Sequence, residues 1–93
     1  MLGILAVLRV NVKRMTDKQV TIYSTATCHF CQLAKAFFDE NNVEYTNVDV
    51  GADQEKAREM VEKSGQMGVP VIFVGEEMVI GFDEARLRDL LGL

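Results

Sequence analysis

Two cysteines stand three residues apart in the stretch Thr-Cys-His-Phe-Cys (27–31), and they are the only cysteines of the 93-residue chain. Such a pair can be a reactive dithiol, part of a metal site, or two small apolar side chains of the core. A zinc site normally takes four ligands. The only histidine is His29, between the two cysteines. One chain therefore does not supply a metal site by itself, although two chains could share one.

The place of Cys28 in the chain favours the dithiol. Residues 19–24, Gln-Val-Thr-Ile-Tyr-Ser, predict a strand, and a helix is expected to begin near Cys28. A cysteine at a helix start faces unpaired N–H groups and the positive end of the helix dipole, and both stabilise the nucleophilic thiolate. We expect Cys28 to attack a disulfide, and the more sheltered Cys31 to attack Cys28 and release the reduced product.

The rest of the chain predicts the elements that position this pair. Apolar residues at helical spacing indicate a helix that ends at Asn41-Asn42, and a second strand follows at residues 43–50. Asp53 is expected to cap a second helix, which ends at Gly65. Residues 70–74 and 78–80 predict a hairpin, and Asp83 is expected to cap a last helix. The inward-facing residues of the three helices are predicted to be Phe30, Leu33, Ala34, Phe37, Ala57, Met60, Val61, Leu87, Leu90 and Leu91.

This order of elements predicts an α/β fold. Strands joined through helices are normally parallel, whereas the closing hairpin is antiparallel. We therefore expect a four-stranded mixed sheet with helices on both faces, formed by residues 16–93. Residues 1–15 either add an edge strand through residues 4–12 or form an N-terminal extension that the function does not need.

Composition narrows the class of protein. The net charge is −4, from 10 basic and 14 acidic residues of mixed order, which argues against a nucleic-acid partner. Two cysteines are too few for a disulfide-stapled secreted scaffold, and no apolar run approaches the ~20 residues that span a bilayer. The apolar start of the chain lacks the basic region of a signal peptide. We expect a cytoplasmic monomer that binds neither nucleic acid nor membrane.

Three separated motifs resemble those of glutaredoxins, within the thioredoxin-fold superfamily. They are Thr-Ile-Tyr-Ser-Thr-Ala-Thr-Cys-His-Phe-Cys (21–31), Gly-Val-Pro-Val-Ile-Phe-Val-Gly (68–75) and Ile-Gly-Phe-Asp (80–83). The chain is most similar to small glutaredoxin-like redoxins of the YruB type. The resemblance implies a thiol–disulfide oxidoreductase that carries electrons, holds no bound cofactor and uses Cys28 and Cys31 as its redox-active pair.

The second motif contains Pro70, which the resemblance implies to be cis. A trans proline that opens an edge strand is the alternative, since few X-Pro bonds are cis. The resemblance also implies that this loop lies beside the cysteines. The backbone of Val69 would then pair with a bound peptide or glutathione.

The chain departs from the usual glutaredoxin pattern at the glutathione contacts. Thr25 stands where a basic residue commonly contacts the glutathione carboxylate, and Gly81-Phe82-Asp83 replaces the usual Gly-Cys-Asp. The electron donor is therefore either glutathione or a thioredoxin reductase. Asp83 either caps the last helix or contacts the amino end of glutathione, and the cap is favoured.

The dipeptide between the cysteines is His29-Phe30, where glutaredoxins usually carry Pro-Tyr. His29 is either an exposed side chain without a role or, when protonated, a neighbour that favours the Cys28 thiolate and makes the disulfide a better oxidant. Phe30 is counted with His29 as a residue that could tune the redox pair, although it is more simply a core or rim residue.

Two rival functions stay open beside the reduction of protein disulfides or glutathione mixed disulfides. Two chains could share an iron–sulfur cluster through Cys28, which the weakened glutathione contacts disfavour. The fold could also serve as a structural adaptor without turnover, which the intact cysteine pair disfavours.

Overall fold

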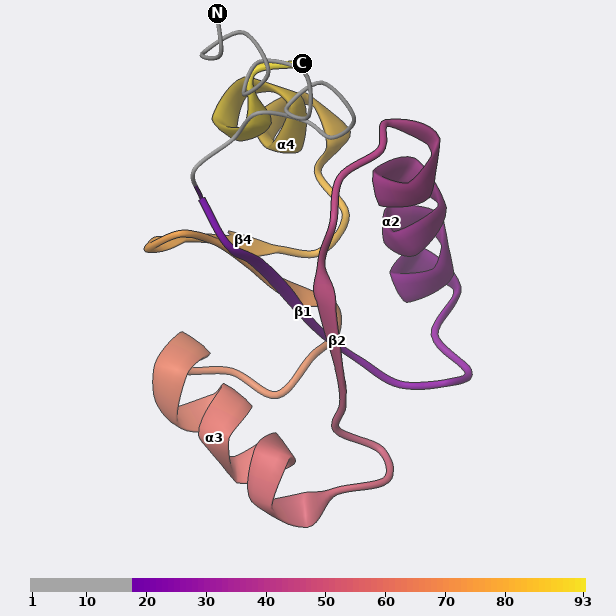
Figure 1. Cartoon of the computed structure of the whole chain (residues 1–93). Helices are drawn as coiled ribbons and strands as arrows, with labels where there is room; N and C mark the ends of the chain where they lie inside the picture. Colours follow the sequence, from indigo (N-terminus) through magenta and orange to yellow (C-terminus); the bar gives the residue numbers. More distant parts are fainter. Residues whose placement is uncertain (1–17) are drawn as a thin grey trace, which may run out of the picture.

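The computed structural model describes residues 18–93, and the edge strand predicted at residues 4–12 lies outside them. Its elements follow the predicted order (Figure 1). They are β1 (Val20–Ser24), α2 (His29–Glu40), β2 (Thr46–Asp49), α3 (Gln54–Ser64), β3 (Val71–Val74), β4 (Glu77–Ile80) and α4 (Glu84–Leu91). The second strand is shorter than predicted because the N–H of Val43 still donates to the carbonyl of Phe38 at 2.9 Å, which continues the end of α2.

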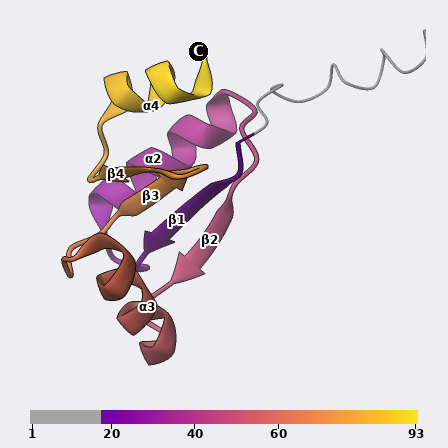
Figure 2. The ribbon, with the colours of Figure 1, turned by 90° about the vertical axis from the view of Figure 1, so that its left-hand side faces the viewer.

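The strands form one mixed sheet in the order β2-β1-β3-β4. β1 and β2 are parallel, whereas β3 is antiparallel to both β1 and β4, as predicted. In this register Tyr23 of β1 lies between Val48 of β2 and Val71 of β3. α2 and α4 cover one face of the sheet and α3 covers the other (Figures 1 and 2).

Each face of the sheet carries its own buried cluster. The larger cluster lies under α2 and α4, and the smaller one lies under α3. Strand alternation explains the division, because neighbouring residues of β1 and β3 point to opposite faces. The larger cluster is formed by Val20, Ile22, Ala34, Phe37, Phe38, Val43, Ile72, Val74, Val79, Leu87 and Leu91, and the smaller by Tyr23, Met60 and Val71.

The prediction of which α2 residues face the core is partly wrong. Phe30 and Leu33 are 57% and 38% exposed, whereas Cys31, Ala34, Phe37 and Phe38 are buried. The helix is turned so that its small residues Cys31 and Ala34 face the sheet, which moves Phe30 and Leu33 to its outer flank. In α3, Met60 is buried as predicted, but Val61 is 36% exposed.

The predicted helix caps are confirmed at both ends of the helices. The carboxylate of Asp53 accepts hydrogen bonds from the N–H groups of Glu55 and Lys56, at 3.0 and 3.2 Å. Gly65 ends α3 with a φ of 77°, a left-handed conformation that favours glycine. After α2, Asn42 takes the left-handed conformation with a φ of 56°.

Candidate functional site

Cys28 lies at the start of α2, just beyond the end of β1. Residues 25–27 make the turn between them, and the backbone N–H of Cys28 donates to the carbonyl of Thr25 at 3.4 Å. Cys28 is the N-cap of α2, and its sulfur accepts a hydrogen bond from the N–H of Cys31 at 3.2 Å. The side chain is half-buried. A sulfur in this position can be reached by a disulfide and is held by a helix N–H group.

Cys31 lies one turn further along α2 and is fully buried. Burial raises the pKa of the Cys31 thiol to about 11, and the hydrogen bond with Cys28 acts in the same direction. At neutral pH Cys31 is therefore a protonated thiol. The two sulfurs share one turn of helix but differ in access to solvent.

The loop before β3 lies against this pair. The Val69–Pro70 peptide bond is cis, which confirms the prediction from the resemblance. The carbonyl oxygen of Val69 lies 3.9 Å from the sulfur of Cys28, within reach of a hydrogen bond that the thiol donates. The carbonyl of Pro70 accepts a hydrogen bond from the N–H of Gly81 at 2.8 Å. The three sequence motifs, far apart in the chain, therefore meet at one end of the sheet.

Phe82 and Asp83 follow Gly81 at this end of the sheet. The ring of Phe82 lies 5.8 Å from that of Phe37 and packs against the larger buried cluster. The carboxylate of Asp83 accepts the N–H of Arg86 at 3.2 Å and so caps α4 as predicted. A contact of either residue with a substrate stays a prediction.

The loop after β2 lies next to Thr25, a neighbour that the sequence did not reveal. A Cβ added at Gly51 would come within 3.4 Å of the Thr25 side chain and 3.3 Å of the Asp49 carboxylate. That carboxylate accepts the N–H groups of Gly51 and Ala52, at 2.9 and 3.2 Å. The Asp-x-Gly sequence is a turn signal, but only the parallel pairing of β1 and β2 places it here.

His29 and Phe30, the residues between the cysteines, are both exposed. Their rings meet edge to face with centroids 5.5 Å apart. Phe30 therefore belongs to the rim of the site and not to the core. The effect of His29 on Cys28 stays a prediction.

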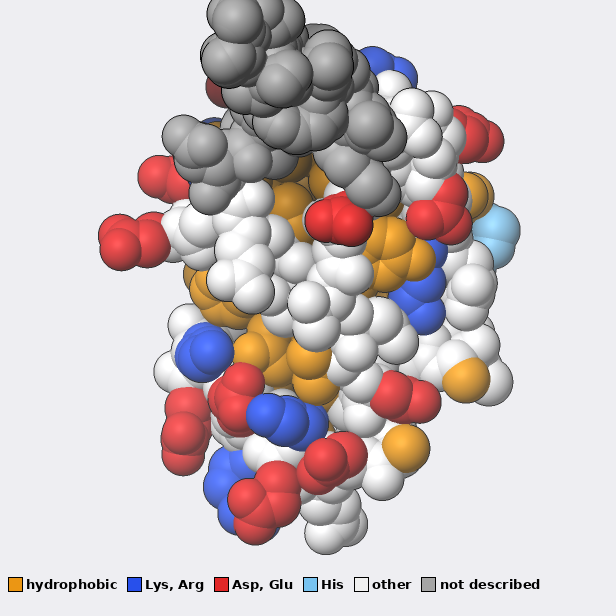
Figure 3. Space-filling model, in the orientation of Figure 1, with side chains coloured by type: hydrophobic (Ala, Val, Ile, Leu, Met, Phe, Trp, Pro, Cys, Tyr) orange, Lys and Arg blue, Asp and Glu red, His pale blue; other side chains and the backbone are white. Residues whose placement is uncertain are grey.

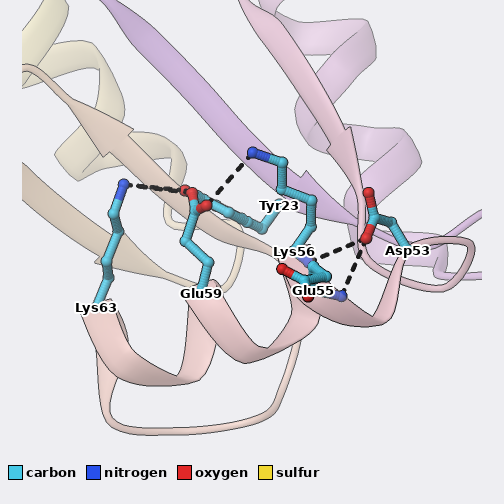
Figure 4. Close-up of polar contacts among 6 residues, drawn as sticks. All are labelled: Tyr23, Asp53, Glu55, Lys56, Glu59 and Lys63. Atoms are coloured by element: carbon cyan, nitrogen blue, oxygen red, sulfur yellow. Dashed lines mark hydrogen bonds and ion pairs between the residues drawn. The ribbon is translucent and has the colours of Figure 1, made fainter.

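A polar cluster fastens α3 to β1 just before the turn that leads to Cys28 (Figure 4). The Tyr23 hydroxyl donates to the Glu59 carboxylate at 2.6 Å and accepts a hydrogen bond from the Lys63 ammonium at 3.3 Å. Lys56 also contacts Glu59, at 3.3 Å. Burial raises the pKa of Tyr23, and the hydrogen bond to Glu59 raises it as well. The sequence contained no signal for this contact, because Tyr23 and Glu59 are 36 residues apart.

Two further observations concern residues 18–93 as a set. They contain no group of three or more His, Cys, Asp or Glu side chains placed to hold a metal ion. None of their helices is long and apolar enough to cross a bilayer.

Comparisons with known proteins agree with this geometry. The family model of Glutaredoxin matches residues 20–79. A glutaredoxin-like 8.6 kDa protein from the rubredoxin operon of Clostridium pasteurianum is 35% identical over 72 residues, which cover 77% of this chain and 96% of that protein. Glutaredoxin 3 of Escherichia coli K12 is 32% identical over 73 residues, covering 78% and 88%. The crystal structure of a glutaredoxin from Archaeoglobus fulgidus has the same fold, with a TM-score of 0.73 and 22% identity over 81% of this chain and 87% of that one.

Proposed function

Because the chain belongs to the glutaredoxin family of thiol–disulfide oxidoreductases, we propose that it reduces protein disulfides or glutathione mixed disulfides through Cys28 and Cys31. One observation carries the proposal: the half-buried sulfur of Cys28 caps α2, while Cys31 is buried one turn away. The two thiols can then act in a fixed order.

Cys28 acts first. A thiolate is the attacking species in disulfide exchange, and the hydrogen bond from the N–H of Cys31, together with the N-terminal dipole of α2, stabilises negative charge on the Cys28 sulfur. The thiolate attacks one sulfur of the substrate disulfide. A bond forms between Cys28 and that sulfur, and the other substrate sulfur leaves as a thiolate.

Cys31 completes the reaction. Its thiol loses a proton and its sulfur attacks the sulfur of Cys28, which releases the second substrate thiolate and leaves a Cys28–Cys31 disulfide. Two electrons have then passed from the dithiol to the substrate. The raised pKa of Cys31 keeps it protonated during the first step, so that it does not compete with Cys28 for the substrate.

The backbone of Val69 is the proposed guide for the substrate. Its carbonyl lies beside the Cys28 sulfur, and the next residue, Pro70, is held by the hydrogen bond that its carbonyl accepts from the N–H of Gly81. An extended peptide, or the peptide bonds of glutathione, can pair with Val69 and bring a disulfide to Cys28. Thr25, Phe82 and Asp83 border this site in our proposal.

The electron donor is glutathione or a thioredoxin reductase. The side chain at position 25 is an uncharged threonine, and position 82 is a phenylalanine packed on Phe37, so two contacts expected for glutathione are altered. Both departures favour the reductase as donor. No bound organic cofactor is needed for either route, because the dithiol itself holds the two electrons.

The test supplies the oxidised protein either with glutathione and glutathione reductase or with thioredoxin reductase, each with NADPH and a disulfide substrate. We expect NADPH consumption in the reductase arm, and none with the Cys28→Ser variant. Consumption only in the glutathione arm would show that glutathione is the electron donor, and the proposed disulfide reduction would stand. No consumption in either arm, from a dimer with visible absorption by iron and sulfide, would overturn the proposal in favour of cluster binding.

A further inference from the structure

The face of the sheet that carries α3 is only partly covered by this helix. Among residues 18–93, α3 alone lies on this face, and its buried residue Met60 packs on Tyr23 and Val71 (Figures 1 and 2). The edge strand β4 alternates, so that Val79 is buried on the opposite face, while Met78 and Ile80 point to this one. Met78 and Ile80 stay 36% and 47% exposed.

A groove of about 400 Å³ opens beside this bare edge. Thr21, Tyr23 and Phe73 belong to its lining on the sheet, and Lys63 of α3 borders it with its ammonium 5.9 Å from the ring centroids of both Tyr23 and Phe73. Met78 pairs directly with Phe73 in the sheet. Figure 3 shows hydrophobic side chains at the surface where the sheet meets α3, with charged side chains around them. The groove is at the end of the sheet away from Cys28, since Gln19, Gly75 and Glu76 complete its lining.

The chain enters the described fold at this groove. Gln19 lines it, and the carbonyl of Gln19 accepts the N–H of Gly75 at 2.8 Å. The side chain of Lys18 runs along Gly75, so close that a Cβ added there would lie 3.4 Å from its Cγ. Seventeen residues precede Lys18, and they therefore join the fold at the end of the groove.

Most of those residues are apolar, as are Phe73 and Met78 at the open edge of the sheet. Seven of the nine residues from 4 to 12 are apolar: Ile4, Leu5, Ala6, Val7, Leu8, Val10 and Val12. Lys13 and Arg14 follow them, and the turn at the groove's end carries the acidic Glu76. The five residues 13–17 can span up to about 17 Å, enough to turn the chain back over the face of the sheet.

We propose that residues 4–12 of this chain dock in the groove beside α3 and cover Phe73 and Met78. The occupant is a segment of the same chain, and the docking completes the apolar cover of the face that α3 leaves open. The site is distinct from the cysteine pair, and the proposal does not depend on the redox activity.

The test is a cross-link between the segment and the groove in the full chain. Both native cysteines are changed to serine, and Val10→Cys is combined with Met78→Cys. The matched control combines Val10→Cys with Leu33→Cys, because Leu33 is 38% exposed, close to the 36% of Met78, but lies on α2 at the other face. We expect a disulfide within one chain to form about tenfold faster in the Met78 variant, because docking raises the local concentration of the two thiols. Equal rates, or cross-links that join two chains, would overturn the proposal.

A second measurement leaves Val10 and Met78 unsubstituted. The methyl signals of the methionines are followed by NMR in the full chain carrying Leu8→Ser. The Met78 methyl signal is expected to shift, whereas that of Met67, which is 78% exposed on the loop before Pro70, is expected to stay in place. An unmoved Met78 signal would contradict the docking.

Discussion

The three helices of residues 18–93 begin in the same way but with different atoms. α3 and α4 are capped by the carboxylates of Asp53 and Asp83, and each has a glutamate in its first turn. α2 is capped by the sulfur of Cys28, and its first turn contains no acidic residue. The N–H that meets the cap comes from the third residue after it in all three helices, at 3.2 Å each time.

The two kinds of cap differ in what the hydrogen bond at the helix start stabilises. A carboxylate cap is a charged acceptor that stabilises a helix by about 1 kcal/mol. A sulfur in its place is a weaker acceptor when protonated, but as a thiolate it gains the same stabilisation from the helix end. The kind of hydrogen bond that caps α3 and α4 is therefore also present at the start of α2, where in our proposal it favours the thiolate of Cys28.

The largest effect is expected when α2 receives the cap of the other two helices. Cys28→Asp should abolish disulfide reduction, because a carboxylate cannot form the mixed disulfide. The free energy of unfolding should stay within about 1 kcal/mol of the parent or rise. NADPH-coupled turnover and urea unfolding measure the two quantities. Asp53→Asn, which replaces one good cap by another, is the control and should leave both nearly unchanged. Turnover in Cys28→Asp would refute the role of the sulfur.

The second prediction separates the two thiols. Cys31→Ser should accumulate a mixed disulfide between Cys28 and the substrate, because the group that resolves it is missing. Mass spectrometry of the trapped complex and peptide mapping identify the bonded sulfur. The Cys28→Ser variant is the control and should trap nothing. A bond to substrate formed through Cys31 in Cys28→Ser would reverse the assigned order.

The third prediction follows from the burial of Cys31. Its pKa in the fold is raised from 9.0 to about 11, so the folded state binds more protons than the unfolded state between these values. The corresponding stability is fully present below pH 9 and is lost as the pH rises toward 11. In the reduced protein the free energy of unfolding should fall through this range by up to about 2 kcal/mol more than in Cys31→Ser. The raised pKa values of Tyr23 and Tyr45 act in both proteins and cancel in the difference. Parallel pH profiles would contradict this account.

The fourth prediction concerns Asp53, the cap of α3, which takes no part in the proposed reaction. Asp53→Ala should lower the free energy of unfolding by about 1 kcal/mol, because two N–H groups of α3 lose their acceptor, and should leave turnover unchanged. Gln54→Ala is the matched control, since its side chain is exposed and takes no part in the cap. A marked loss of turnover in Asp53→Ala, with the fold intact, would show that the cap of α3 contributes to activity and not only to stability.

The smallest effect is expected at His29, the first residue of α2. When protonated, it should favour the Cys28 thiolate and so raise the redox potential. His29→Gln should therefore lower the potential by about 30 mV. Equilibration of each protein with glutathione measures the potential. An unchanged potential would leave His29 without an electrostatic role.

Local signals in the sequence were sufficient to predict where the helices start and where α3 ends. Asp53, Asp83 and Gly65 act through side chains or backbone conformations of their own segment, and each was predicted correctly. The cis peptide at Pro70 followed only from the resemblance, since a single proline does not decide its isomer.

The sequence was less informative about features that depend on contacts between segments far apart in the chain. Spacing along α2 allowed two adjacent apolar stripes, and the fit of Cys31 and Ala34 against the sheet chose the one that exposes Phe30 and Leu33. The hydrogen bond from Tyr23 to Glu59 and the approach of Gly51 to Thr25 likewise join distant segments. No periodicity predicts such pairs, because they depend on how the elements pack.

The hydrogen bond from the N–H of Cys31 to the Cys28 sulfur also gives the molecule a built-in spectroscopic indicator. A sulfur engaged in a disulfide is a poorer acceptor than a thiolate, so oxidation should weaken this one bond and leave the carboxylate caps of Asp53 and Asp83 as they are. The amide resonance of Cys31 would then move and exchange faster with solvent on oxidation, while those of Lys56 and Arg86 serve as internal references. The redox state of the protein could be read from three amides in a single spectrum, without any label.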